Sequence, residues 1–526
     1  MKIINASQWQ CLKTQDISHY YVGQHVASPS LCAQSFRPFA WLEFNHQSGE
    51  LSAARDHFGQ EPFYYHYHEH AQLFIFGSNI PDILRHLLTH PNSNEKCEQE
   101  IFDRPRDNDD PPYSTETYFQ GIFRLTPAHI LRINKKGVSE SAYWSLDPKV
   151  ESLNYSRDEE YLEHFSALMD EALSCLLPKD TKFAAEFSGG LDSSAIFVAC
   201  RKAHLSPALF TQPPPASYRI SDEDLNVQHL LKYFQWHDHH CFVDARDFDP
   251  ISVFKYFSQV YAGCPPYWLS MLASNVYKKA VEQGYTTIVS GYAGDECVSL
   301  DCPPYLSYFQ HLQEHGLFSL LRLWRQDSAK SAPGLPRLKL FFRLLQYLNP
   351  QVGSRIFQIS KLLGFREQQI QFYRSLRDYE FAVLQGDISH EVRMKVECSA
   401  VLAKSLGFTF VYPFLYPPLI EFCFRLPLHK KKQGTLMRCL IREYLSAHVS
   451  GLKSNTKGGA FVPSTMQKCR DYAAQGAFLE HFSNLPFQYK INANKPSEFR
   501  FMLEARAFML KHYRLTQTHT PHKCEK

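Results

Sequence analysis

The sequence has little net charge and lacks both a signal peptide and a membrane-length apolar run. Its 526 residues contain 56 Lys and Arg against 53 Asp and Glu, which leaves a formal net charge of +3. This balance gives no electrostatic reason to expect a nucleic acid or a membrane surface as the main partner. The start "MKIINASQWQCLKTQ" has no basic-then-apolar pattern, and Arg343 interrupts the apolar run "LKLFFRLLQYL". We therefore expect a soluble, cytoplasmic protein with no nucleic-acid or membrane partner.

Two common kinds of site are also missing. The 14 cysteines are scattered, without a CxxC pair or the His/Cys spacing of a metal centre, so we expect reduced thiols. The phosphate-binding loop GxxxxGK[ST] of kinase-type enzymes does not occur. A nucleotide site in this chain must therefore be built from a different loop.

Two patterns of hydrophobic residues divide the chain. Residues 36–90 read as short alternating segments separated by turns ("FAWLEF", "ELSAAR", "FYYHYH", "QLFIFG"), and "HILRI" and "SAYWSL" follow, which predicts an antiparallel sheet. From residue 156, strands alternate with amphipathic helices, which predicts a parallel sheet covered by helices on both faces. Beyond residue 305 the pattern is mostly helical. We predict an α/β protein with two domains, residues 1–150 and 151–526.

The stretch "EFSGGLDSSA" lies where a predicted strand passes into a helix. Glycines allow the backbone to approach an anion closely, and the N–H groups that begin a helix favour phosphate. Asp192 would repel a phosphate unless a magnesium ion bridges the two, because Mg²⁺ prefers carboxylate and phosphate oxygens. The stretch therefore predicts a phosphate-binding loop formed by Ser188, Gly189, Gly190, Asp192, Ser193 and Ser194.

A second loop of the same kind, "SGYAGDE", follows the predicted strand "TTIVSG". It contains Gly291, and it places Asp295 at another strand end. Ligands of parallel α/β sheets bind beyond the carboxyl ends of the strands, where the two loops would meet. One carboxylate from each loop, Asp192 and Asp295, would hold Mg²⁺ against the phosphates of ATP. ATP and Mg²⁺ are the cofactors that we expect.

These motifs resemble those of the asparagine synthetase family of ATP-dependent amide ligases. "FSGGLDSS" is similar to the family's pyrophosphate loop, and "SGYAGDE" to its second nucleotide loop. The segments "VECSAVLAKSLGFTFVYPFLYPPLIEFCFRLP", "QGTLMRCLIRE" and "NTKGGAF" resemble its C-terminal part, while "GELSAARDHFGQEPFYYHY" and "TYFQGIFRLTPAHILRI" resemble its glutaminase domain. The resemblance implies a PP-loop ATP pyrophosphatase domain behind a glutaminase-like antiparallel sheet. It also implies a reaction in which a carboxylate forms an acyl-adenylate and pyrophosphate, and an amine then displaces AMP.

The N-terminal part departs from the glutamine-fed members of that family. Residue 2 is Lys2 where those members carry the cysteine nucleophile, the "RDHFG" segment begins early, at Arg55, and no Asn-Gly-Glu glutamine signature precedes it. Cys11 and Cys32 do not lie at an amino terminus. We therefore expect a degenerate domain without glutamine hydrolysis, with the amine coming from ammonia or from the substrate itself.

Two branches of the family close a ring with an amine of the substrate: the β-lactam synthetases and the cyclases that form the macrolactam of lasso peptides. Resemblance to the first branch implies that Tyr292, paired with Glu397, takes a proton from the amine, a role typically worth ~10²–10⁴-fold in rate. It also implies that Lys457 neutralises charge on the adenylate, with Lys453 as the alternative. Tyr416 stands where the family usually has Asp.

The activity we predict is lasso-type cyclisation of a peptide, joining its N-terminal amine to an Asp or Glu side chain. The resemblance then implies a leader-recognition protein and a leader peptidase as partners. Ammonia-dependent asparagine synthesis and a β-lactam-type closure of a small molecule remain open. A non-catalytic binding protein on the same fold is the alternative of a different class, although both carboxylates and both loops are intact.

Overall fold

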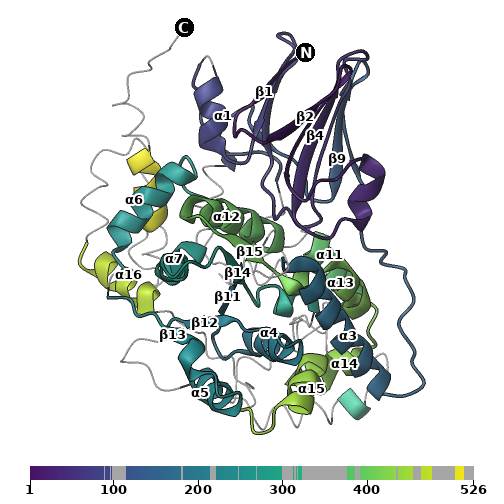
Figure 1. Ribbon diagram of the computed structural model, residues 1–526, viewed down its shortest axis with the longest axis vertical. Coiled ribbons are helices and arrows are strands. Elements are labelled where there is room, and N and C mark those ends of the chain that lie inside the picture. The colour runs from purple at the N-terminus through teal and green to yellow at the C-terminus, as the bar shows by residue number, and fades with distance from the viewer. Residues whose placement is uncertain are drawn as a thin grey trace, which may run out of the picture.

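Two β-sheets packed face to face form the N-terminal part of the computed structural model (Figure 1). A four-stranded sheet has the order β1-β7-β6-β8, and a six-stranded antiparallel sheet has the order β10-β9-β5-β4-β3-β2. The strands are β1 (Lys2–Asn5), β2 (Gln10–Lys13), β3 (Ile17–Gly23), β4 (Phe39–Asn45), β5 (Leu51–Arg55), β6 (Tyr64–His68), β7 (Leu73–Gly77), β8 (Phe123–Arg124), β9 (His129–Asn134) and β10 (Gly137–Ala142), and helix α1 (Ile80–His86) follows β7.

Alternation along strand β4 explains how the two sheets pack. Leu42 and Phe44 point toward the four-stranded sheet and share a core with Phe63, whereas Trp41 points to the opposite face and packs near Cys32. Period-two burial of this kind is the property of a strand that the sequence pattern detects. The segments predicted as β4 to β7 and β9 are confirmed as strands. "SAYWSL" is not, because the strand β10 ends at Ala142.

The second part contains a five-stranded parallel sheet with the order β13-β12-β11-β14-β15. Strand order reverses beside β11, because the chain runs from β11 outward to β13 and then returns to β14 on the other side. At such a point the loops after the two adjacent strands diverge and leave a crevice for a ligand. The strands are β11 (Ala184–Glu186), β12 (Ala208–Thr211), β13 (His240–Phe242), β14 (Thr287–Val289) and β15 (Thr409–Val411).

Helices cover both faces of this sheet, as the sequence pattern predicts, and the predicted α/β fold class is confirmed. Figure 1 shows α3, α4 and α15 on one face and α7 and α12 on the other. The helices are α3 (Glu159–Leu176), α4 (Leu191–Lys202), α5 (Asp222–Tyr233), α6 (Pro250–Val260), α7 (Ser274–Glu282), α11 (Leu376–Gln385), α12 (Glu391–Leu406), α13 (Pro417–Phe424), α14 (Leu428–Lys431), α15 (Cys439–His448) and α16 (Ser464–Ala474).

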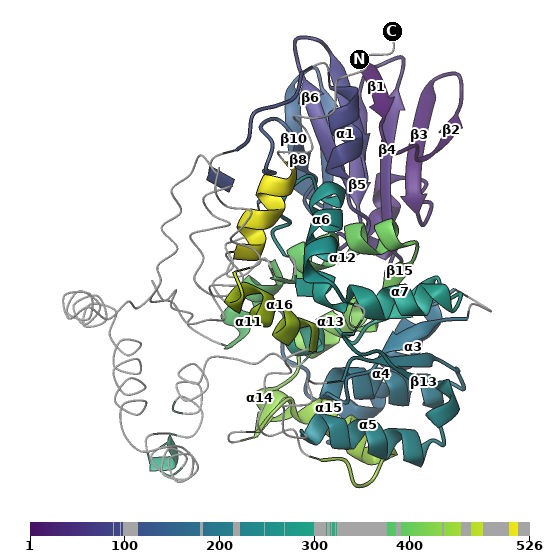
Figure 2. The same cartoon turned by 90° about the vertical axis from the view of Figure 1, so that its left-hand side faces the viewer.

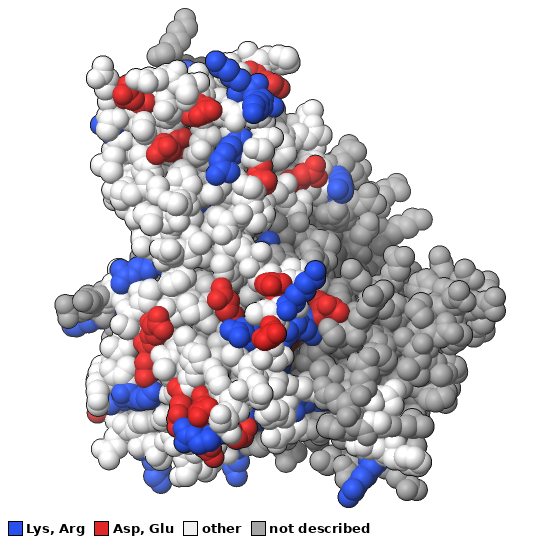
Figure 3. All heavy atoms as spheres, turned by 90° about the vertical axis from the view of Figure 1, so that its right-hand side faces the viewer, with Lys and Arg blue, Asp and Glu red and all other residues white. Residues whose placement is uncertain are grey.

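The structure describes residues 1–87, 89–94, 96–97, 114–178, 182–213, 221–246, 248–267, 269–298, 376–385, 391–433, 436–453, 464–476 and 504–513, and a few residues between 312 and 322. Across these ranges no helix is long and apolar enough to span a bilayer. On the face that Figure 3 shows, basic and acidic side chains are interspersed, as the small net charge leads one to expect.

A buried ionic cluster joins the two parts. Both Figure 1 and Figure 2 place helix α12 beneath the N-terminal strands. Glu397 belongs to this helix. Its carboxylate lies 2.8 Å from Arg55 Nη1 and 2.8 Å from Arg124 Nε, and it accepts a hydrogen bond from the Tyr64 hydroxyl at 2.8 Å. Burial alone would raise the pKa of Glu397, but the two guanidinium groups outweigh burial and lower it.

Loss of this carboxylate should destabilise the protein strongly. In Glu397→Gln the two arginines remain buried without their counter-charge, an arrangement that costs about 3–5 kcal/mol. Glu282→Gln is the matched control, since Glu282 pairs with Lys279 on the surface at 3.6 Å and such pairs are worth roughly 0–1 kcal/mol. Urea unfolding of the full chain measures both variants, and equal midpoints would contradict the account.

Candidate active site

The first loop passes from strand β11 into helix α4 and presents hydroxyl and N–H groups at the end of the sheet. Ser193 Oγ accepts a hydrogen bond from the backbone N–H of Ser188 at 3.2 Å and lies 3.0 Å from the Ser188 hydroxyl. Gly189 has a φ of +77°, and a Cβ there would lie 2.1 Å from the carbonyl oxygen of Glu223. A side chain at Gly189 is therefore excluded both by its backbone conformation and by the neighbouring helix.

The second loop packs directly on the first. A Cβ on Gly291 would lie 2.8 Å from the backbone nitrogen of Ser193, and a Cβ on Gly294 would lie 2.1 Å from Asp192 Oδ1. Gly291 thus lets the two backbones approach closely, and Gly294 leaves room for the Asp192 side chain. A single π-helical turn, Gly294–Val298, then places Asp295 beside the first loop. Turns of this kind are frequent at functional sites.

Asp192 and Asp295 line the same cavity, and the charge of Asp295 affects Asp192. Burial raises the pKa of Asp192 to about 6, and the charge of Asp295 adds to that rise. Burial would also raise the pKa of Asp295, but a hydrogen bond from Glu296 and the cations Arg438 and Lys395 lower it. Arg438 forms an ion pair with Asp192. The two loops therefore hold acidic groups whose mutual repulsion a cation relieves.

This donor set fits Mg²⁺. Magnesium is usually bound by one or two carboxylates together with substrate phosphates rather than by a cage of protein ligands. Over the ranges that the structure describes, no group of three or more His, Cys, Asp or Glu side chains is placed to hold a metal alone. Two carboxylates beside a phosphate-type loop need no third protein ligand, so the residues present suit an ion that arrives with a nucleotide.

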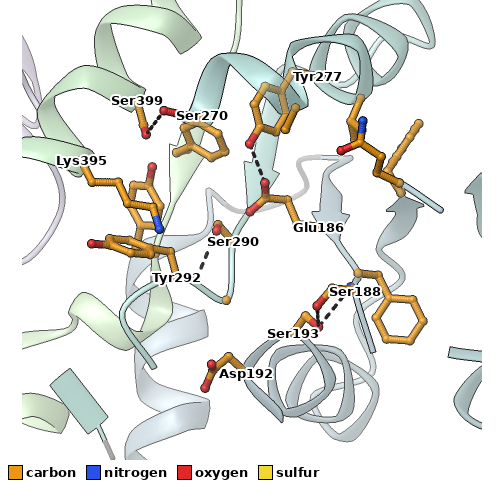
Figure 4. Close-up of a pocket in the computed structure, with 18 of the residues that line it drawn as sticks. Glu186, Ser188, Asp192, Ser193, Ser270, Tyr277, Ser290, Tyr292, Lys395 and Ser399 are labelled. Atoms are coloured by element: carbon orange, nitrogen blue, oxygen red, sulfur yellow. Dashed lines mark hydrogen bonds between the residues drawn. The ribbon is translucent and has the colours of Figure 1, made fainter. Parts of the chain in front are cut away.

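A cavity of about 420 Å³ extends from the two loops across the end of the sheet (Figure 4). Besides Asp192 and Asp295 it exposes two further charged side chains, Glu186 and Lys395. The Tyr277 hydroxyl donates a hydrogen bond to Glu186 Oε1 at 2.7 Å, and Lys395 Nζ lies 3.5 Å from the centre of the Tyr292 ring. The cavity thus has two aspartates at the end formed by the loops, and the carboxylate of Glu186 and the ammonium of Lys395 lie further inside.

The structure brings most of the predicted site residues together. Ser188, Asp192, Ser193, Gly291, Tyr292 and Asp295 line the cavity, while Gly189 and Ser194 line a second one, of about 380 Å³, on the other side of the first loop. The pairing of Tyr292 with Glu397 is not formed. Lys395 and Ser399 are four residues apart on α12 and share the helix face that lines the cavity. Glu397 lies between them in sequence, so it faces the N-terminal arginines instead.

The structure gives a different answer for each of the other three residues singled out in the sequence, Lys457, Lys453 and Tyr416. Lys457 lies outside the described residues. Lys453, its alternative, lines the second cavity, and its backbone N–H donates to Asn226 Oδ1 at 2.8 Å. Tyr416 is fully buried, and its hydroxyl donates to Glu171 at 2.6 Å away from the cavity.

Sequence reasoning missed three charged residues of the site: Glu186, Lys395 and Arg438. A signal existed for the first, because an acidic residue interrupts the apolar strand "FAAEF" only two positions before Ser188. Lys395 and Arg438 gave no such signal, since lysine and arginine are ordinary on helix surfaces and in loops. Only the packing of distant segments reveals where those two side chains point.

Comparison with known proteins gives a consistent result. Residues 31–144 match the family model of the glutamine amidotransferase domain, and residues 164–471 match that of asparagine synthase. Asparagine synthetase [glutamine-hydrolyzing] 3 of Bacillus subtilis is 29% identical over 198 residues, 38% of this chain and 29% of that protein. The putative asparagine synthetase [glutamine-hydrolyzing] 2 of Methanocaldococcus jannaschii is 27% identical over 280 residues, half of each chain. Amidase chry2 of Gibberella zeae is 26% identical over 161 residues, 30% of this chain and 22% of that protein. The chain thus covers half or less of these curated relatives.

Asp192→Asn should abolish ATP consumption while the protein stays folded. The amide keeps the shape of the carboxylate but removes the charge that a magnesium ion needs, and Mg²⁺ and ATP should then no longer raise the melting temperature. Thermal unfolding with and without Mg-ATP, together with an assay of pyrophosphate release, measures both effects. ATP consumption at the wild-type rate in this variant would show that Asp192 has no part in nucleotide chemistry.

Proposed function

Because the chain belongs to the asparagine synthase family, we propose that it is an ATP-dependent amide ligase that works through an acyl-adenylate. The observation that carries this proposal is the cavity in which two loops, each following a parallel strand, hold Asp192 and Asp295 side by side. A carboxylate substrate would attack the α-phosphate of ATP and release pyrophosphate. An amine would then attack the acyl carbon and release AMP.

The residues of the cavity divide this work between them. Asp192 and Asp295 would hold Mg²⁺, which when bound neutralises the triphosphate and the departing pyrophosphate. The Ser188 and Ser193 hydroxyls and the N–H groups that begin α4 are placed to hold phosphate oxygens. Lys395, the one lysine or arginine among the described lining residues, would hold the carboxylate of the acid substrate. Tyr292, beneath the Lys395 ammonium, keeps that cation in place through its ring.

The amine should come from ammonia or from the substrate rather than from glutamine. What supports this is the N-terminal domain, in which Cys32 is unsuited to act as a nucleophile. Cys32 is fully buried and receives a hydrogen bond from the Trp41 indole, and burial raises the pKa of its thiol. Cys11 lies within the exposed edge strand β2. A reactive thiol needs a lowered pKa in an accessible site.

The substrate that we propose is a peptide whose N-terminal amine is joined to its own Asp or Glu side chain in a lasso-type macrolactam. A ring-closing substrate supplies its own amine, so it needs no glutaminase. A leader-recognition protein and a leader peptidase would be the partners, because the amine must be exposed before it can react. Asparagine synthesis from ammonia is the second candidate, and the two relatives named as asparagine synthetases favour it.

Release of pyrophosphate from Mg-ATP over a small substrate panel tests the proposal. The panel contains L-aspartate with ammonium chloride, L-aspartate with L-glutamine, a β-amino acid with a distal carboxylate, and precursor peptides encoded beside this gene, with their leaders removed. We expect turnover with a peptide alone and a product lighter by one water. Formation of asparagine from aspartate and ammonia would show that the protein is an ammonia-dependent asparagine synthetase and not a cyclase. Asparagine formed with glutamine would contradict the account of the N-terminal domain.

A further inference from the structure

Glu186 is an unusual residue for its place in the fold. It ends β11, the central strand of the parallel sheet, and its neighbours Ala184, Ala185 and Phe187 are all buried. Strands of parallel sheets are normally apolar because helices cover both faces, and a carboxylate there loses hydration. Its side chain is only half-buried because it opens into the cavity. A charge kept at this cost calls for a ligand or a reaction that uses it.

Tyr277 holds this carboxylate in one position. Its hydroxyl donates to Glu186 Oε1 at 2.7 Å, and its ring packs against Phe408 and Phe410 with centroids 5.3 and 5.2 Å away. Burial raises the pKa of Tyr277 well above 10, so the phenol stays protonated and acts only as a donor. Within the described part of the chain, no lysine, arginine or histidine forms an ion pair with Glu186. The carboxylate is therefore oriented but not neutralised.

The position of Glu186 in the cavity limits what it can bind. In Figure 4 it lies between Lys395 on one side and the loop of Ser188 and Ser193 on the other. ATP and the acid substrate are both anionic, and a carboxylate would repel either of them. The amine is the one reactant that is a cation at neutral pH, and as an ammonium ion it has no lone pair with which to attack. An uncompensated carboxylate beside the acyl group is suited to bind this ion and remove its proton.

We propose that Glu186 is the group that binds the ammonium form of the amine substrate and accepts its proton. This inference rests on the proposed amide ligation. As the nitrogen forms its bond to the acyl carbon, one proton passes from the ammonium to Glu186. The bond from the acyl carbon to the phosphate oxygen breaks, its electron pair stays on AMP, and the second proton leaves with the AMP phosphate. Amide and AMP are the products, and Glu186 returns its proton to water.

This assignment replaces the Tyr292–Glu397 pair with a different tyrosine–carboxylate pair. Glu397 is occupied by two arginines and does not line the cavity. Tyr277 and Glu186 are in contact and both line it. The substrate class that follows is a primary amine or ammonia that arrives protonated, which suits both candidate reactions and leaves their acid component open.

The experiment measures the two half-reactions, adenylate formation and acyl transfer, separately in the variant Glu186→Gln. Exchange of labelled pyrophosphate into ATP reports adenylate formation, using whichever panel acid supports pyrophosphate release, L-aspartate or a peptide. Transfer of the acyl group is then measured to the protonated amine that the wild type uses, which is ammonium chloride for L-aspartate or the N-terminal ammonium for a peptide. It is also measured to hydroxylamine, a nucleophile that is mostly unprotonated at neutral pH. We expect transfer to ammonium to fall by ~10²-fold or more, while exchange stays within about threefold of the wild type and hydroxamate still forms.

A second tyrosine–carboxylate pair outside the cavity supplies the control. Tyr416 donates to Glu171 at 2.6 Å, so Glu171→Gln removes a similar charge and should leave both half-reactions unchanged. If Glu186→Gln does not fold, Tyr277→Phe releases the carboxylate and should give a smaller loss in the same direction. Equal losses of exchange, hydroxamate and ammonium transfer in Glu186→Gln would overturn the proposal, as would normal ammonium transfer. Absence of exchange in the wild type with every panel acid would instead refute the amide ligase itself.

Discussion

The contact between two glycine-containing loops is the constraint on which the site depends. Gly291 and Gly294 bring the second loop so close to Asp192 and Ser193 that no Cβ fits between them. This close approach places Asp192, in the first turn of α4, and Asp295, in the turn Gly294–Val298, beside one cavity. This packing brings together the acidic end of the cavity, the first turn of α4 and the phosphate-type loop. A β-carbon at Gly291 would collide with the backbone of Ser193, and one at Gly294 would collide with the side chain of Asp192.

The N-terminal domain has a structural role that is independent of glutamine. Glu397, Arg55 and Arg124 form a buried ionic cluster between this domain and α12. Buried pairs of this kind often add little net stability, but loss of one partner is costly, so they fix how elements are oriented. The opposite face of α12 carries Lys395 and Ser399 into the cavity. The N-terminal domain therefore holds in place the helix that lines the cavity.

Much of this architecture is predictable from the sequence, because it depends on local patterns. Period-two alternation identifies strands such as β4, and the small residues around Asp192 and Asp295 identify the loops. The structure differs from the sequence predictions where contacts between distant segments determine the position of a residue or an element. Strand β15 is only three residues long, and a single turn separates it from helix α12. The sequence pattern therefore reads the apolar residues of β15 as part of a helical region. Glu397 was expected beside Tyr292, but its two arginine partners lie 273 and 342 positions earlier in the chain, beyond any local pattern. Lys395 and Arg438 are missed for the same reason.

Transfer of oxygen from the acid to AMP tests the central claim, the acyl-adenylate, most directly. The acid substrate is labelled with ¹⁸O in its reacting carboxylate, and the AMP released in one round of turnover is examined by mass spectrometry. Attack of the carboxylate on the α-phosphate predicts that one labelled oxygen appears in AMP and the other stays in the amide. Unlabelled AMP, or release of ADP with labelled inorganic phosphate, would contradict the mechanism assigned to the cavity.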